Sequence, residues 1–206
     1  MKHLPTRIEE IMSKPSVNES TRLFLSSLLE QVDRNGALSE KQLEALRRIE
    51  QRNSEEFLIK KEKWRAQYDD EKREAAQICA LYYTRGVTGY YSDLAHRVLD
   101  EPDFIPTEAQ WRAMCLNKFA TRVIEETRSE PKYAAGTMVE FRKGLTPLLY
   151  KENNVVAMVV ESDCGPVLKA AKGSKRYRIL PVGESIVIEV EERRIKKYRK
   201  KGVKDG

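Results

Sequence analysis

Histidine, the side chain best suited to acid–base catalysis near neutral pH, is scarce in this sequence. The chain of 206 residues contains only His3 and His96. A serine, cysteine or threonine nucleophile needs a base within hydrogen-bond reach. His96 lies in a predicted helix beside Leu94 and Val98, where a histidine more commonly has a packing or surface role. We therefore expect no catalytic residue and no enzyme activity.

Motifs that hold nucleotides or metals are also missing. Neither Gly-x-x-x-x-Gly-Lys-Ser/Thr nor Gly-x-Gly-x-x-Gly occurs. The three cysteines, Cys79, Cys115 and Cys164, are too far apart for a zinc knuckle or a disulfide framework. Adjacent acids such as Glu191-Glu192 diverge on a helix and are interpreted as solvated charge. We expect no cofactor, no metal and no small-molecule substrate, although a nuclease built from distant carboxylates stays open.

Positive charge is concentrated in the last third of the chain. The net charge is +6, but residues 132–206 carry 17 Lys and Arg against 9 Asp and Glu, and the preceding residues are slightly acidic. The segment from Arg193 to Lys204 contains no acid. Such a run suits a phosphate backbone or an acidic protein surface. The alternative is a solvated tail that only aids solubility.

Two further arginines flank Tyr177 in a predicted strand, so that both point to one face. If that face is exposed, it extends the basic tail and neutralises phosphates in a salt-dependent, weakly sequence-dependent way. The alternative is a basic surface without a ligand. The predicted nucleic-acid-binding residues are Arg176, Arg178, Arg193, Arg194, Lys196, Lys197, Arg199, Lys200 and Lys201.

Tyrosines gather around Gly86 and Gly89. Exposed rings would stack on unpaired bases, each contact contributing about 1–3 kcal/mol. The commoner role is a hydrophobic seam between helices, with the hydroxyl groups reaching water. The possible base-stacking residues are Tyr82, Tyr83, Tyr90 and Tyr91.

Helical patterns dominate residues 6–130. Apolar residues recur at helical spacing over 23–32, and Asn35-Gly36 is a typical stop. Capping boxes over 39–42 and 107–110 each predict a helix start. A long charged helix is expected over 55–83. This pattern predicts an α-helical domain over residues 1–131.

Alternating patterns replace the helical ones after Pro131. Strands are expected over 137–141, 155–160, 177–179 and 186–190, with turns between them. The spacing is typical of a small antiparallel barrel. The predicted fold is therefore α+β, with a domain boundary near residue 132 and a small antiparallel β-barrel with a basic tail over 132–206.

The stretch from Gly136 to Ile195 carries a family resemblance. A leading Gly136, a valine-containing strand, a tyrosine-containing third strand and a Val-x-Glu-x-x-Ile segment over Val190 to Ile195 resemble an SH3-like barrel of the KOW or Tudor type. The resemblance implies a binding module without catalysis. Such modules bind nucleic acid, RNA polymerase, ribosomal RNA or modified peptides.

The helical hairpin in the first third, with Leu28-Leu29-Glu30-Gln31 followed by Leu38-Ser39-Glu40-Lys41-Gln42, is similar to a segment of uncharacterised bacteriophage proteins encoded near replication genes. This similarity implies a phage or phage-derived origin and a role around nucleic acid.

Membrane and secretory classes are disfavoured by the apolar pattern. The longest apolar run, Val155 to Val160, has six residues, whereas a membrane span needs about 20. Acidic residues precede any apolar stretch of signal-peptide length. We expect a cytoplasmic protein, in a bacterial or host cell.

The combined hypothesis is a non-catalytic nucleic-acid-binding accessory or regulatory protein, acting in replication, transcription or RNA handling. In this hypothesis the basic end holds DNA or RNA and the helical domain contacts a protein partner. The alternative is a protein-interaction adaptor that binds and regulates a host or replication/transcription enzyme.

Overall fold

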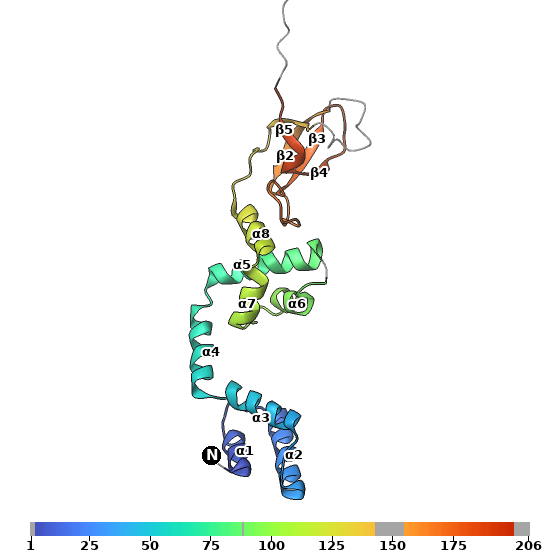
Figure 1. Cartoon of the computed structure of the whole chain (residues 1–206). Helices are drawn as coiled ribbons and strands as arrows, with labels where there is room; N and C mark the ends of the chain where they lie inside the picture. Colours follow the sequence, from blue (N-terminus) through green and yellow to red (C-terminus); the bar gives the residue numbers. More distant parts are fainter. Residues whose placement is uncertain (1–2, 88, 143–154, 200–206) are drawn as a thin grey trace, which may run out of the picture. The chain divides into compact units, whose positions relative to one another are not determined.

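The computed structural model describes residues 3–87, 89–142 and 155–199, in which helices come first and strands last (Figure 1). These residues contain eight α-helices followed by a five-stranded antiparallel sheet, which confirms the predicted α+β class. The chain divides into two compact units, Met1–Gln67 and Tyr68–Gly206. The change from helices to strands, where a boundary was predicted near residue 132, lies inside the second unit.

The first unit consists of α1 (Leu4–Met12), α2 (Glu19–Asn35), α3 (Glu40–Arg52) and α4 (Glu55–Gln67). Its core contains Ile8, Leu25 and Leu46, all fully buried. Helix α2 ends at Gly36, whose positive φ of 70° suits glycine. The predicted capping box at Ser39 and Gln42 begins α3, so the predicted stop of one helix and the start of the next are confirmed.

The single long helix expected over 55–83 is wrong. Helix α4 ends at Gln67, and α5 (Asp70–Leu81) begins directly afterwards. Asp69 is the cause, because its carboxylate accepts a hydrogen bond of 2.9 Å from the backbone N–H of Lys72 and so caps a new helix. After α5, a single π-helical turn, η1 (Tyr82–Gly86), ends the helix.

The remaining helices of the second unit are α6 (Ser92–Asp100), α7 (Glu108–Cys115) and α8 (Lys118–Arg128). The predicted capping box at Thr107 and Gln110 begins α7. The apolar stripe from Trp111 to Ile124 predicts a single helix after this box, but Asn117 divides it into α7 and α8. Its side-chain oxygen caps α8 by accepting from Phe119 and Ala120, and its amide group donates to the hydroxyl oxygen of Tyr83 at 2.8 Å.

The sheet has the strand order β4-β3-β2-β1-β5, with every neighbouring pair antiparallel. Its core includes Val139, Val159, Tyr177 and Ile195. Among the described residues β4 and β5 do not pair, so the strands form an open sheet and not the closed barrel that was expected. The strands are β1 (Met138–Phe141), β2 (Val156–Ser162), β3 (Arg176–Pro181), β4 (Ile188–Glu191) and β5 (Ile195–Lys197), with a 3₁₀ turn, η3 (Glu192–Arg194), before β5.

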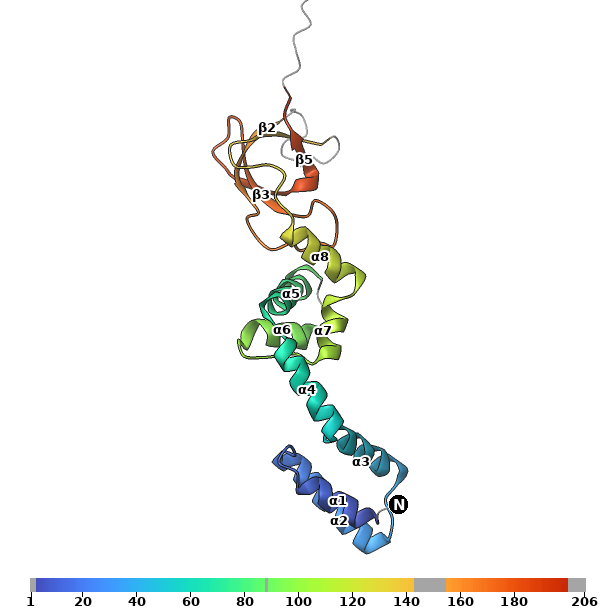
Figure 2. The ribbon, with the colours of Figure 1, turned by 90° about the vertical axis from the view of Figure 1, so that its left-hand side faces the viewer.

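The connection between β2 and β3 packs against the helices of the same unit, and Figure 2 shows this loop beside α8. Val167 is 3% exposed and belongs to the helical core. A Cβ atom on Gly86 would lie 2.4 Å from the backbone oxygen of Leu168, so only glycine allows this approach. The ammonium group of Lys175, 1% exposed, donates to the Thr127 carbonyl oxygen at 2.9 Å and to Asp163 at 2.7 Å.

We predict that Lys175→Met destabilises the protein by about 2 kcal/mol, because the Thr127 carbonyl and the Asp163 carboxylate lose a charged donor while the packing volume is kept. Thermal and urea unfolding measure the change. Lys172→Met, an exposed position in the same loop, is the control and should change stability little. Equal stability of both variants would contradict a structural role for the buried ammonium group.

Candidate nucleic-acid interface

Arg176 and Arg178 lie on β3 as predicted, but both face carboxylates. The register places Arg178 opposite Glu161 on β2 and opposite Glu189 on β4. Its guanidinium group lies 2.9 Å from Glu161 and 3.5 Å from Glu189. Arg176 also pairs with Glu189. These cross-strand pairs leave the two arginines little net positive charge to offer a phosphate.

Arg193 in η3 is likewise paired. Its Nε atom donates to Glu191 at 2.6 Å, and Lys169 contacts the other Glu191 oxygen at 2.6 Å. Burial raises the pKa of Glu191, but the hydrogen bonds from Lys169 and Arg193 outweigh burial, and the pKa is lowered below its ordinary value. Glu191 therefore stays ionised between two cations.

Glu192 is part of a small network that joins η3 to the start of the sheet. Its carboxylate accepts from the Tyr177 hydroxyl group at 2.7 Å and from the Lys132 backbone N–H at 3.0 Å. Burial, followed by the Glu192 hydrogen bond, raises the pKa of Tyr177. The interpretation of Glu191-Glu192 as solvated charge is wrong, because both carboxylates satisfy specific donors.

Exposed cations remain along the open side of β5. Arg194, Lys197 and Arg199 have no ion pair with any residue that the structure describes, and Lys196 pairs with Glu140 at 3.1 Å. Lys200 and Lys201 of the predicted site lie outside the described residues. Part of the basic segment predicted from the sequence therefore lies on β5, at the edge of the sheet, and immediately before and after it.

Arg142 lies beside these cations, although no sequence pattern singles it out. It directly follows β1, and its backbone N–H donates to the Arg194 carbonyl oxygen at 2.8 Å. Its Nε atom donates to the Ile195 carbonyl oxygen at 3.1 Å. Only the pairing of β1 with β5 brings it there. We call the following group the cationic edge: Arg142, Arg194, Lys196, Lys197 and Arg199.

The tyrosine cluster is divided between core and surface. Tyr82 and Tyr83 are both 5% exposed in the helical core, and burial raises the pKa of each hydroxyl group. The Tyr83 ring lies 4.9 Å from that of Tyr82 and 5.0 Å from that of Tyr91. This packing favours the alternative of a seam between helices for Tyr82 and Tyr83. Tyr90 and Tyr91 are 67% and 38% exposed, so these rings still reach solvent.

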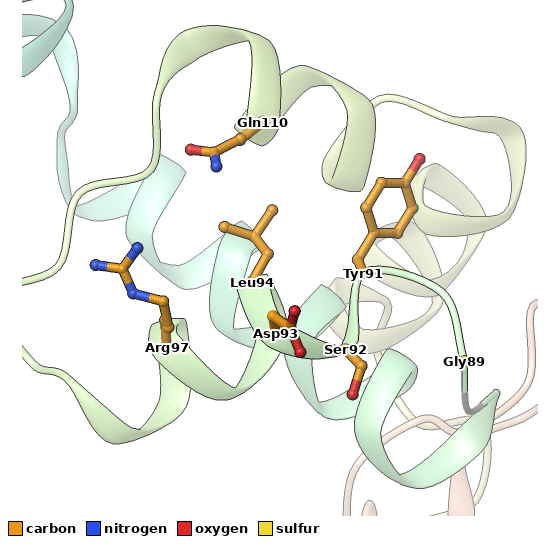
Figure 3. Close-up of a pocket in the computed structure, with 7 residues that line it drawn as sticks. All are labelled: Gly89, Tyr91, Ser92, Asp93, Leu94, Arg97 and Gln110. Atoms are coloured by element: carbon orange, nitrogen blue, oxygen red, sulfur yellow. The ribbon is translucent and has the colours of Figure 1, made fainter. Parts of the chain in front are cut away.

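Tyr91 also borders an open groove of about 560 Å³ between α6 and α7. In Figure 3, Leu94 points toward Gln110 on α7, the Tyr91 ring stands at the other end of the groove, and Ser92 points away. Arg97 at the end of the groove pairs with Glu101 at 3.0 Å and lies 3.9 Å from the centre of the Phe104 ring. The groove is lined by Gly89, Tyr91, Ser92, Asp93, Leu94, Arg97 and Gln110, without a nucleophile and base in contact.

The side chains of His96, Cys79 and Cys115 make local contacts. His96 is exposed, and its Nδ1 atom lies 2.9 Å from the Ser92 carbonyl oxygen. Cys115 is buried beside Cys79, and the hydrogen bond between them, together with burial, raises the pKa of the Cys115 thiol. No group of three or more His, Cys, Asp or Glu side chains suited to a metal occurs among the described residues. In the same residues, every helix is too short or too polar to span a bilayer.

No protein-family model, curated protein or solved structure matches this chain.

We predict that Glu191 makes stability depend on pH. Its lowered pKa means that its ion pairs contribute fully above the ordinary value of 4.5 and are lost as pH falls through the folded-state value. Glu191→Gln should therefore be less stable than the original chain near neutral pH, and the difference should narrow in acid. Melting temperatures from neutral pH down through pH 4.5 measure the effect, with Glu130→Gln, an exposed position of the same unit, as the control. A difference that stays constant with pH would contradict it.

Proposed function

We propose that this protein binds nucleic acid through the cationic edge and acts as a non-catalytic accessory or regulatory factor in replication, transcription or RNA handling. The observation that carries the proposal is the row of exposed cations on β5 and beside it, of which only Lys196 has a described acidic partner. Lysine and arginine side chains in such a row replace the counterions of a phosphate backbone. The binding is expected to depend on salt more than on base sequence.

The proposal includes an SH3-like architecture for the sheet. The strand order β4-β3-β2-β1-β5 and the 3₁₀ turn before β5 support it. The Val-x-Glu-x-x-Ile segment supports it too, because Val190 and Ile195 are buried in the sheet core and Glu192 binds Tyr177 and Lys132. The similarity of the helical hairpin to phage segments, also part of this proposal, supports a role close to nucleic acid.

The alternative function is an adaptor in which the same edge grips an acidic protein surface. Added salt weakens either kind of complex, so salt dependence does not separate them. The material that copurifies with the protein separates the two functions. Bound nucleic acid raises the absorbance at 260 nm, whereas a protein partner gives a stoichiometric band on a gel.

We predict that replacing Arg194, Lys197 and Arg199 together by alanine weakens binding to labelled DNA or RNA at every sequence tested. If each side chain contacts one phosphate, the slope of log affinity against log salt should fall by about 2–3. Fluorescence anisotropy with single-stranded and double-stranded DNA and RNA, at several salt concentrations, measures both quantities and identifies the preferred polymer.

A matched control removes the same net charge elsewhere, by replacing Lys41, Arg47 and Lys60 of the first unit with alanine. This control should keep the original slope. Arg176→Ala with Arg178→Ala should have the smaller effect expected of paired arginines. An equal loss in the control would refute the cationic edge as the site, and absence of binding at low salt would refute the function and favour the adaptor.

A further inference from the structure

The face of the sheet that points away from its core carries a row of apolar side chains. The register sets Met138 on β1 opposite Met158 on β2, and Met158 opposite Leu180 on β3. Tyr198 extends this row, because its backbone N–H donates to the Met138 carbonyl oxygen at 2.9 Å. Alternation along the strands places these four side chains on the same outer face.

The apolar surface continues around the end of the sheet. In the connection from β3 to β4, Val182 and Ile186 are 65% and 66% exposed, and Val187 is also exposed. Met138, Met158 and Val160 are exposed as well. An apolar surface of this kind on one face typically marks an interaction site, and methionine adapts its shape to a partner.

The charges that border this row cancel. Glu140 pairs with Lys196 on one side of it. On the other side, Arg178 lies between Glu161 and Glu189. A phosphate polymer gains little from such a neutral border, whereas an apolar centre with a polar rim is typical of protein–protein interfaces.

The topology makes this face complementary to itself. Strand β2 is the middle of five, so a two-fold axis parallel to β2 and just outside the face would set β2 on β2 of a second copy and β3 over β1. Met158 would then meet Met158 of the second copy, and Leu180 would meet Met138. Sheets commonly pack face to face with nearly aligned strands.

The charges at the two edges fit the same two-fold axis. Lys196 on β5 pairs with Glu140 on β1, and Glu140 pairs with Val156 on β2, so the three residues lie at the same height along the strands. Val182 is level with Val156, because its N–H donates to the Val156 carbonyl oxygen. The exposed Glu184 lies in the connection from β3 to β4, where its backbone N–H donates to the Pro181 carbonyl oxygen at 3.1 Å. This turn keeps Glu184 within about 7 Å of the end of β3, on the opposite side of the sheet from Lys196. The rotation would bring Lys196 of one copy near Glu184 of the other.

We propose that this outer face pairs with the same face of a second copy, forming a two-fold dimer centred on Met158. The interface is isologous, since each contact occurs twice. Four of the five cations of the cationic edge (Arg142, Arg194, Lys197 and Arg199) take no part in this contact, so the dimer presents two such edges. The proposal does not rest on nucleic-acid binding.

The first test is the mass of the full chain in solution, measured by sedimentation equilibrium from micromolar to millimolar concentration. The original chain should reach the dimer mass, with a dissociation constant on the order of micromolar. Met158→Lys should raise that constant at least about tenfold, because it sets two unpaired charges against each other at the centre. Leu116→Lys, an equally simple change at an exposed apolar residue of the helices, should leave it unchanged.

The second test uses the symmetry directly. Met158→Cys in a Cys164→Ser background should form a disulfide with the same residue of a second copy under mild oxidation, because position 158 lies on the axis. Leu116→Cys in the same background should stay monomeric on a non-reducing gel. Circular dichroism shows whether each variant is folded.

A chain that stays monomeric at millimolar concentration would overturn the proposal and leave the face to a different protein. A dimer that Met158→Lys does not weaken, or that Met158→Cys does not cross-link, would overturn it equally, because the contact would then lie elsewhere.

Discussion

Lys175 holds the second unit together at the point where its sheet meets its helices. A buried ammonium group is costly unless its donors are satisfied, and here the Thr127 carbonyl and the Asp163 carboxylate satisfy two of them. The contact requires the β2–β3 loop to lie close to the helices, which in turn requires glycine at position 86. Strand β3 begins at Arg176, directly after Lys175, so the loop sets where this strand starts and its pairing with β2 and β4 sets the register.

Ion pairing decides which of the many cations can serve a ligand. Arg176, Arg178 and Arg193 are as basic in the sequence as Arg194 or Lys197, yet each lies against a glutamate. The strand register brings glutamates to Arg176 and Arg178, whereas Arg193 pairs with Glu191, two residues earlier in the chain. Exposed pairs of this kind stabilise a fold only slightly, but they remove net charge from the surface. The cations that remain are on the edge strand, where lysine and arginine also discourage pairing with a foreign strand.

Local signals in the sequence predicted local structure well. The capping boxes at Ser39 and Thr107 and the stop at Gly36 are confirmed because each needs only a few neighbouring residues. Asp69 and Asn117 were missed because their caps interrupt apolar patterns that continue on both sides. The pairs of Arg178 and the position of Arg142 depend on which strands are neighbours, and that choice is made by contacts between distant segments.

The alternation of buried and exposed residues along β2 also predicts which side chains form the outer face of the sheet. The apolar run Val155 to Val160 predicts a strand. Its alternate residues Ala157 and Val159 are buried, while Met158 and Val160 are exposed. A strand that only covered a core would gain by placing polar residues on its solvent side. The sequence instead keeps methionine and valine there, while the flanking charges are neutralised in pairs. Apolar residues at the centre and paired charges at the margin together favour a surface that is covered by protein, whereas the cations of β5 stay open to a phosphate backbone.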